Sequence, residues 1–158
     1  MSNKRTASIA FVAALLTIGG CATSPEAEMR QQNMEADIDE ILSYELDETE
    51  YGDPENCLSD QKYRSFRALG DRHLLFEGRR DKQWVNILRG RCPGLSRNSV
   101  FIMKPSMAGR ACDMDRFEIA DRSDAILSQG TGSSCVLGEF IPVAKAQIQE
   151  IENRLEMR

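Results

Sequence analysis

The five cysteines constrain this chain of 158 residues more than any other feature of its sequence. Cys21 ends a leader that starts with Lys4 and Arg5 and continues with an apolar stretch over residues 6–18. That stretch is too short for a transmembrane helix, which needs about 20 residues. A basic start followed by a short apolar stretch is typical of a secretory signal peptide. We therefore predict that residues 1–20 are a signal peptide and that the rest of the chain is exported.

The residues up to Cys21 resemble the lipobox that the lipoprotein signal peptidase reads. Ile18-Gly19-Gly20-Cys21 carries this resemblance, because a pair of small residues precedes a single cysteine. The resemblance implies cleavage before Cys21 and acylation of its thiol and amine, and several acyl chains together anchor a protein stably on a membrane. The alternative is an ordinary secretory signal. Ala22 follows the cysteine, where an acidic residue would favour the inner membrane, so we expect the periplasmic face of the outer membrane.

The other four cysteines predict two disulfide bonds. Cys57, Cys92, Cys112 and Cys135 are an even number in a chain sent to an oxidising compartment. They include no Cys-x-x-Cys pair, and the single histidine, His73, is distant in sequence, so we expect no metal and no other cofactor. Four cysteines allow three connectivities. We favour Cys92 with Cys112, which closes a loop of about 20 residues, and Cys57 with Cys135, which would tie the first strand to the last.

Charge is distributed unevenly along the chain. Residues 26–60 contain thirteen acidic residues and one basic residue, whereas residues 61–113 contain twelve basic and four acidic residues. The formal net charge of the whole chain is −5. An exported, acidic chain is a poor partner for nucleic acid, and we predict none.

The acidic segment over residues 26–49 has a roughly helical spacing of apolar residues, without glycine or proline. The apolar positions are Met34, Ile38, Ile41, Leu42 and Leu46. Because they are few and the acidic residues many, we favour a solvated, partly helical tether within residues 21–56. The alternative is an arm that folds onto the basic face of the domain or onto a basic partner.

Short apolar or alternating runs separated by turn residues follow from Cys57 onward, as is typical of antiparallel β structure. We predict six strands, over residues 63–69, 73–77, 83–88, 100–104, 116–120 and 136–141. Several runs are apolar on both faces, which favours a small, disulfide-bonded, partly closed β-barrel over an open one-sided sheet. The predicted fold is therefore mainly β, with a barrel domain and a terminal helix over residues 57–158.

The terminal helix is predicted over residues 143–158, directly after Pro142. Ile148, Ile151 and Leu155 are spaced i, i+3 and i+7, which makes one face apolar. We expect this face to pack against the open side of the barrel. The alternative is that it contacts a partner.

No constellation of catalytic residues is recognisable in the sequence. His73 would titrate near neutral pH, but the chain has no nucleophile elbow, no His-Glu-x-x-His and no phosphate loop. Asp113 and Asp115 would lie on one face of a strand, and two carboxylates are too few for a calcium site. We therefore predict that the protein is not an enzyme.

Basic residues form the candidate binding site. Clustered guanidinium groups bind phosphate and carboxylate groups through paired hydrogen bonds. In the cell envelope, such groups are found on lipids, lipopolysaccharide, peptidoglycan and acidic proteins. The alternative is a solvated surface that the acidic segment partly neutralises. The cluster consists of Arg79, Arg80 and Lys82 at a predicted hairpin, with Arg89, Arg91 and Arg97 around Cys92.

Several short motifs between Cys57 and Val143 resemble an uncharacterised family of small exported proteobacterial proteins. The resemblance implies a scaffold with four cysteines, and it supplies no catalytic or ligand-binding residue. The motifs are Leu74-Leu75-Phe76, Trp84-Val85-Asn86, Leu88, Cys92-Pro93-Gly94-Leu95, Gly109-Arg110-Ala111-Cys112-Asp113 and Cys135-Val136-Leu137-Gly138.

Taken together, these features predict a lipid-anchored protein of the cell envelope that acts as a binding or interaction module. Its partners would be the membrane, through the lipid on Cys21, and an envelope protein or anionic envelope ligand. Two other classes stay open. One is an enzyme or thiol-disulfide accessory protein with an exchangeable disulfide, and the other is a purely structural envelope protein.

Overall fold

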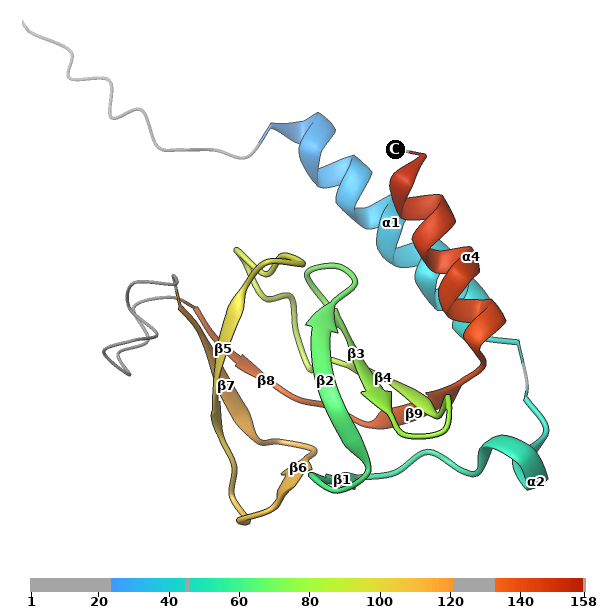
Figure 1. Cartoon of the computed structure of the whole chain (residues 1–158). Coiled ribbons are helices and arrows are strands. Elements are labelled where there is room, and N and C mark those ends of the chain that lie inside the picture. Colours follow the sequence, from blue (N-terminus) through green and yellow to red (C-terminus); the bar gives the residue numbers. More distant parts are fainter. Residues whose placement is uncertain (1–23, 45, 121–132, 158) are drawn as a thin grey trace, which may run out of the picture.

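The computed structural model describes residues 24–44, 46–120 and 133–157, so the predicted signal peptide and Cys21 lie outside the described residues. Two helices lie side by side against one face of a β structure (Figure 1). The elements in chain order are α1 (Pro25–Leu42), α2 (Glu48–Tyr51), β1 (Cys57–Ser59), β2 (Tyr63–Ala68), β3 (His73–Gly78), β4 (Gln83–Ile87), β5 (Val100–Lys104), β6 (Arg110–Cys112), β7 (Arg116–Ala120), β8 (Ser134–Val136), β9 (Phe140–Val143) and α4 (Lys145–Glu156).

The strands form three antiparallel sheets, so the expected barrel is not closed. A four-stranded sheet has the order β2-β3-β4-β9, a three-stranded sheet the order β5-β7-β8, and β1 pairs with β6. The two larger sheets are linked by a hydrogen bond from Arg89 N to Val136 O, 3.1 Å long. At their other edges, β2 and β5 meet through the rings of Phe66 and Phe101, whose centroids are 5.1 Å apart. No strand pairing joins these edges within the described residues.

Five of the six predicted strands agree with the structure to within one residue. They correspond to β2, β3, β4, β5 and β7. The prediction of a single strand over residues 136–141 is wrong, because β8 and β9 are separate elements. The short β1 and β6 were not predicted.

Gly138 lies at the break between β8 and β9, and buried Asn86 holds it. Asn86 Nδ2 donates to Gly138 O at 2.6 Å, and Gly138 N donates to Asn86 Oδ1 at 3.0 Å. A Cβ atom at residue 138 would lie 2.0 Å from the carbonyl oxygen of Ile87. This close approach of two backbones therefore requires glycine.

Two hydrophobic cores lie on the two faces of the four-stranded sheet. On β3, Phe76 belongs to the core between the sheets, and Leu75 to the core beneath the helices. Successive side chains of a strand point to opposite faces, so a strand covered on both sides reads as a continuous apolar run. The helix pair therefore explains the two-sided apolar pattern of β3 and β4, which in the sequence favoured a barrel.

Helix α1 packs onto the domain instead of extending as a solvated tether. Ser24 caps it by accepting a hydrogen bond from Ala27 N at 3.3 Å, and Pro25 occupies its first turn. Ile38 and Ile41 are 1% and 2% exposed, respectively. The expectation of a solvated segment is wrong for this helix, because its few apolar residues are enough to cover one face of the sheet together with α4.

Helix α4 confirms the predicted terminal helix, although it begins at Lys145 because β9 continues to Val143. Ile148 and Ile151 are buried in the core beneath the helices. Gln147 Nε2 donates to Ile41 O at 3.0 Å, which ties α4 to the end of α1. No described helix is both long and apolar enough to cross a membrane.

Both disulfide bonds differ from the favoured pairing. Cys57 is bonded to Cys112, its direct partner across the β1-β6 ribbon, and Cys92 is bonded to Cys135 of β8. The prediction of Cys92 with Cys112 and Cys57 with Cys135 is therefore wrong. It failed because the pairing of β1 with β6, which brings two of the cysteines together, has no local sequence signal.

Candidate functional site

The hairpin between β3 and β4 carries three cations on an unusual turn. Lys82 N donates to Arg79 O at 3.3 Å, and the two residues between them, Arg80 and Asp81, have φ angles of 57° and 60°. Two successive left-handed residues make a type I′ turn, which favours Asn-Gly. A residue with a side chain is strained by about 1 kcal/mol in this conformation. The strained backbone of Arg80 and Asp81 is thus part of the same turn as the three cations.

A groove of about 650 Å³ lies beside this turn. Its wall includes Trp84, whose side chain is almost entirely buried, and half-buried Tyr51 at the end of α2. We call it the hairpin groove. Its lining residues are Tyr51, Gly52, Asp53, Pro54, Glu55, Gln61, Lys62, Arg79, Arg80, Lys82 and Trp84.

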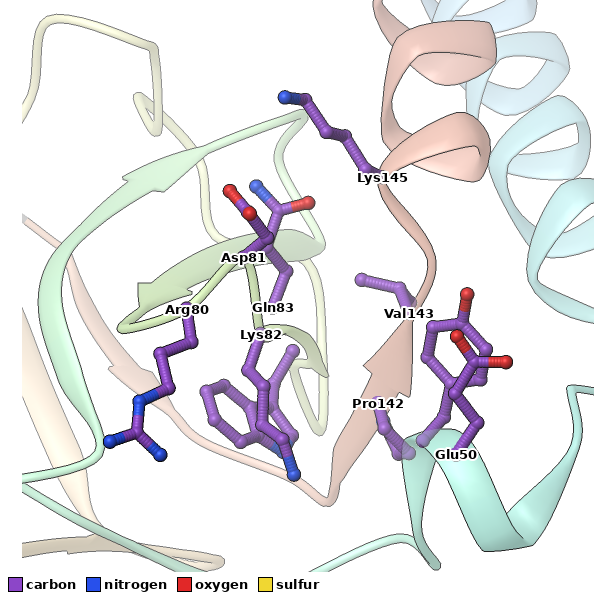
Figure 2. A pocket seen from close by; sticks show the side chains of 10 residues that line it. Glu50, Arg80, Asp81, Lys82, Gln83, Pro142, Val143 and Lys145 are labelled. Atoms are coloured by element: carbon purple, nitrogen blue, oxygen red, sulfur yellow. The ribbon is translucent and has the colours of Figure 1, made fainter.

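A second pocket, of about 320 Å³, adjoins the hairpin groove. The two share Tyr51, Arg80, Lys82 and Trp84 as lining residues, so they form one surface around the turn. Figure 2 shows the charged ends of Arg80 and Lys82 directed to the same side, whereas the Asp81 side chain extends to the other. The turn thus directs Arg80 and Lys82 away from the carboxylate of Asp81.

The three turn cations make no ion pair with any other described residue. On the groove wall, Lys62 pairs with Glu55, which offsets that carboxylate. An anion in the hairpin groove would therefore meet three cations that make no ion pair with another described residue, together with Tyr51, Trp84 and one further lining carboxylate, Asp53. This arrangement suits a ligand with phosphate or carboxylate groups.

The other half of the predicted basic cluster lies elsewhere and is neutralised. Arg89 pairs with Asp113, with Nε 2.9 Å from Oδ1, and its hydrogen bonds hold the pKa of Asp113 below its ordinary range. The five residues of β4, about 17 Å of extended chain, separate this region from the hairpin. Arg91 pairs with Glu35, and Arg97 lies 4.0 Å from Glu156. The structure thus divides the predicted cluster into two groups.

Sequence reasoning missed the aromatic and lysine residues of the hairpin groove. Trp84 sits in an apolar strand, where its neighbours give no sign of a binding surface, and Tyr51 precedes Gly52 and Pro54 in a segment without a recognisable motif. Lys62 gave no signal, because it reaches the groove only through the packing of β2 beside the hairpin. The hairpin itself had a sequence signal, namely two strand-like runs separated by a short charged segment.

The other titratable residues considered from sequence have structural positions. His73 is completely buried on β3, with Nε2 3.2 Å from Asp39 Oδ1, and burial lowers its pKa. Asp115 accepts hydrogen bonds from Ser106 N and Cys112 N, each 2.8 Å long. Burial opposes these bonds, but they outweigh it and lower the pKa of Asp115. Within the described residues, no three His, Cys, Asp or Glu side chains are placed to hold a metal ion.

Comparison with family models gives one match, to DUF6491, a family of unknown function, over residues 4–156. The chain belongs to this family. The match extends well beyond the region from Cys57 to Val143 that resembles an uncharacterised family in the sequence, and it includes helices α1, α2 and α4. Comparisons with curated proteins and with solved structures found no match. DUF6491 membership therefore assigns no role to any residue of the hairpin groove.

Proposed function

We propose that this DUF6491 protein is an exported, lipid-anchored protein of the cell envelope that binds anionic groups in its hairpin groove and catalyses no reaction. The observation that carries this proposal is the set of three uncompensated cations, Arg79, Arg80 and Lys82, beside the aromatic wall of a groove of about 650 Å³. Ligand sites commonly combine apolar walls with a few polar groups that fix orientation.

The distance of the groove from the proposed anchor favours one class of ligand. Helix α1 begins at Pro25, and four extended residues from Cys21 span at most about 14 Å. A lipid on Cys21 would thus hold the start of α1 close to the bilayer. The hairpin groove lies near α2, beyond the other end of this 18-residue helix, which is about 27 Å long (Figure 1). The groove would face away from the anchoring membrane, toward peptidoglycan or an acidic envelope protein.

Burial of the disulfides argues against the thiol-exchange alternative. Cys92 is fully buried, and Cys112 and Cys135 are each 5% exposed. Exchange requires that an attacking thiolate reach a sulfur atom. The bond between Cys92 and Cys135 offers little such access, whereas Cys57 of the other bond is partly exposed.

Crosslinking in intact cells tests the proposal directly. A photo-crosslinking amino acid in place of Gln61, an exposed residue of the groove wall, should capture a discrete envelope component. The triple variant Arg79→Gln, Arg80→Gln, Lys82→Gln should reduce that capture at least about tenfold, since each charge-assisted hydrogen bond contributes about 1.5–3 kcal/mol.

The matched control removes three positive charges that do not line the groove, through Arg64→Gln, Arg110→Gln and Arg116→Gln. These arginines are exposed and lie outside the hairpin groove. Capture that is equal in both triple variants would refute the groove as the binding site. A Cys21→Ser variant separately tests the anchor, because it should release the protein from the membrane fraction without changing the groove.

A further inference from the structure

Helix α1 is held to the domain by a cluster of polar side chains, of which Glu35, Asp71 and His73 are buried. Gln31, Glu35 and Asp39 follow one another at intervals of four residues, so they lie on one face of α1. Opposite them lie Asp71, in the β2–β3 connection, and His73 of β3. Gln31 Nε2 donates to Asp71 Oδ2, and His73 faces Asp39. Glu35 and Asp71 are only 8% and 6% exposed, respectively, although carboxylates are seldom buried without a partner.

The guanidinium group of Arg91 pairs with one of these two buried carboxyl groups, that of Glu35. Arg91 Nε lies 3.0 Å from Glu35 Oε1, and Arg91 Nη2 donates to Glu35 Oε2 at 3.1 Å. No ion pair with Asp71 is present among the described residues. If both carboxyl groups were ionised, the cluster would hold one uncompensated negative charge, which is costly away from water.

Two buried oxygen atoms without a hydrogen bond indicate where a bound proton would remove the uncompensated charge. Glu35 Oε1 and Asp71 Oδ1 are buried and have no hydrogen bond of acceptable geometry with the described residues. A proton on Asp71 would let this carboxyl group donate to Glu35. Burial, followed by the hydrogen bond and the charge of Glu35, raises the pKa of Asp71 to about 6, although the charge of Arg91 opposes the shift.

We propose that the carboxyl pair of Glu35 and Asp71 is a proton-operated latch between α1 and the rest of the protein. With one shared proton the pair is hydrogen-bonded and α1 is held firmly. Without it, two carboxylates face each other across the helix interface, and α1 opens more often. The latch lies apart from the hairpin groove and does not depend on the proposed binding function.

The pH dependence of the latch must be separated from that of His73. The pKa of Asp71 rises from 3.8 to about 6 on folding, so its contribution to stability is complete below about pH 3.8 and is lost as pH rises through 6. The pKa of His73 falls from 6.5, so its contribution is present above pH 6.5 and is lost as pH falls. The charged neighbours that shift His73 are Asp39, Glu35 and Arg72. As pH rises, the contribution of Asp71 to stability is therefore lost while that of His73 is gained.

Comparing the chain with its Asp71→Asn variant at two pH values keeps His73 constant. The measurement is the hydrogen-exchange protection of the α1 amides, corrected for intrinsic exchange rates. Asparagine is uncharged and can donate to Glu35. The protection of α1 in the variant, divided by that in the parent chain, should therefore be about tenfold greater at pH 7.5 than at pH 5, where the folded parent pair still holds its proton.

Glu28→Gln is the matched control, because Glu28 is an exposed carboxylate of α1 that lies outside the cluster. Its protection relative to the parent chain should be the same at both pH values. If the protection of α1 in Asp71→Asn relative to the parent chain did not change with pH, the proposal would be overturned. If that variant fails to fold, carbon-13 NMR titration of the parent chain decides. A carboxyl group of the pair titrating near pH 6 supports the latch, and titration of both near pH 4 refutes it.

Discussion

At the β3–β4 turn, two residues with side chains occupy the backbone region that asparagine and glycine favour. Arg80 and Asp81 could be replaced by Asn-Gly at the same net charge, and the turn would then match its type I′ geometry. The strain therefore arises because these two positions carry an arginine and an aspartate in place of Asn-Gly. A strained backbone that displays uncompensated cations at the edge of a groove is expected of a binding site.

The double variant Arg80→Asn, Asp81→Gly should raise the free energy of unfolding by about 1–2 kcal/mol, because it relieves two left-handed positions. Urea denaturation measures this change. The same variant should weaken ligand capture at the hairpin groove, since it removes one guanidinium. Lys82→Gln serves as the control, because it removes a cation without relieving strain. If the double variant were less stable than the parent, the type I′ assignment of the turn would be wrong.

At the scale of elements, α1 shows how few apolar residues can dock a helix. Its hydrophobic stripe is thin and its surface is acidic, yet Ile38 and Ile41 are buried against β3, β4 and α4. Ion pairs add to this contact, among them those of Arg154 of α4 with Glu40 and Asp37. Exposed pairs of this kind contribute little individually, so most of the stability of the contact comes from apolar burial.

Ile38→Ala should lower the free energy of unfolding by about 2–4 kcal/mol, because it opens a cavity where α1 meets the sheet and α4. Chemical denaturation of the chain measures the loss, and hydrogen exchange should show α1 as the most affected element. Met29→Ala is the control, since Met29 is 59% exposed and belongs to the same helix. Equal effects of the two substitutions would mean that α1 does not dock as described.

At the scale of the whole molecule, two disulfide bonds fix the relative position of the sheets. The bond between Cys92 and Cys135 joins the segment after β4 to the three-stranded sheet, and the bond between Cys57 and Cys112 closes the two-stranded ribbon. Their sequence separations are 43 and 55 residues. In the chain-entropy model, loops of these lengths stabilise the folded state by about 4 kcal/mol each.

Replacing Cys92 and Cys135 by alanine should therefore lower the free energy of unfolding by about 2–4 kcal/mol. The variant with Cys57 and Cys112 replaced should lose a similar amount, because the two loops are comparable in length. Peptide mapping without reductant measures the connectivity independently. It should recover the two bonds described here, and a peptide linking Cys92 to Cys112 would contradict the fold.

The sequence alone determined the elements whose signal is local. Alternating and two-sided apolar runs located β2, β3, β4, β5 and β7, and the spacing of Ile148, Ile151 and Leu155 located α4, because side-chain periodicity depends only on neighbouring residues. The prediction of one strand over residues 136–141 was wrong because local periodicity does not show where this segment is interrupted. Its interruption is imposed by Asn86, about fifty residues earlier in the chain.

Only the tertiary structure decided which distant segments meet. The pairing of the cysteines follows from the contact of β1 with β6, and the open arrangement of the sheets from β2 and β5 meeting through side chains. The burial of α1 and the separation of the hairpin cations from Arg89, Arg91 and Arg97 are likewise set by packing. Each depends on the free energy of contacts between residues far apart in sequence, which local periodicity does not encode.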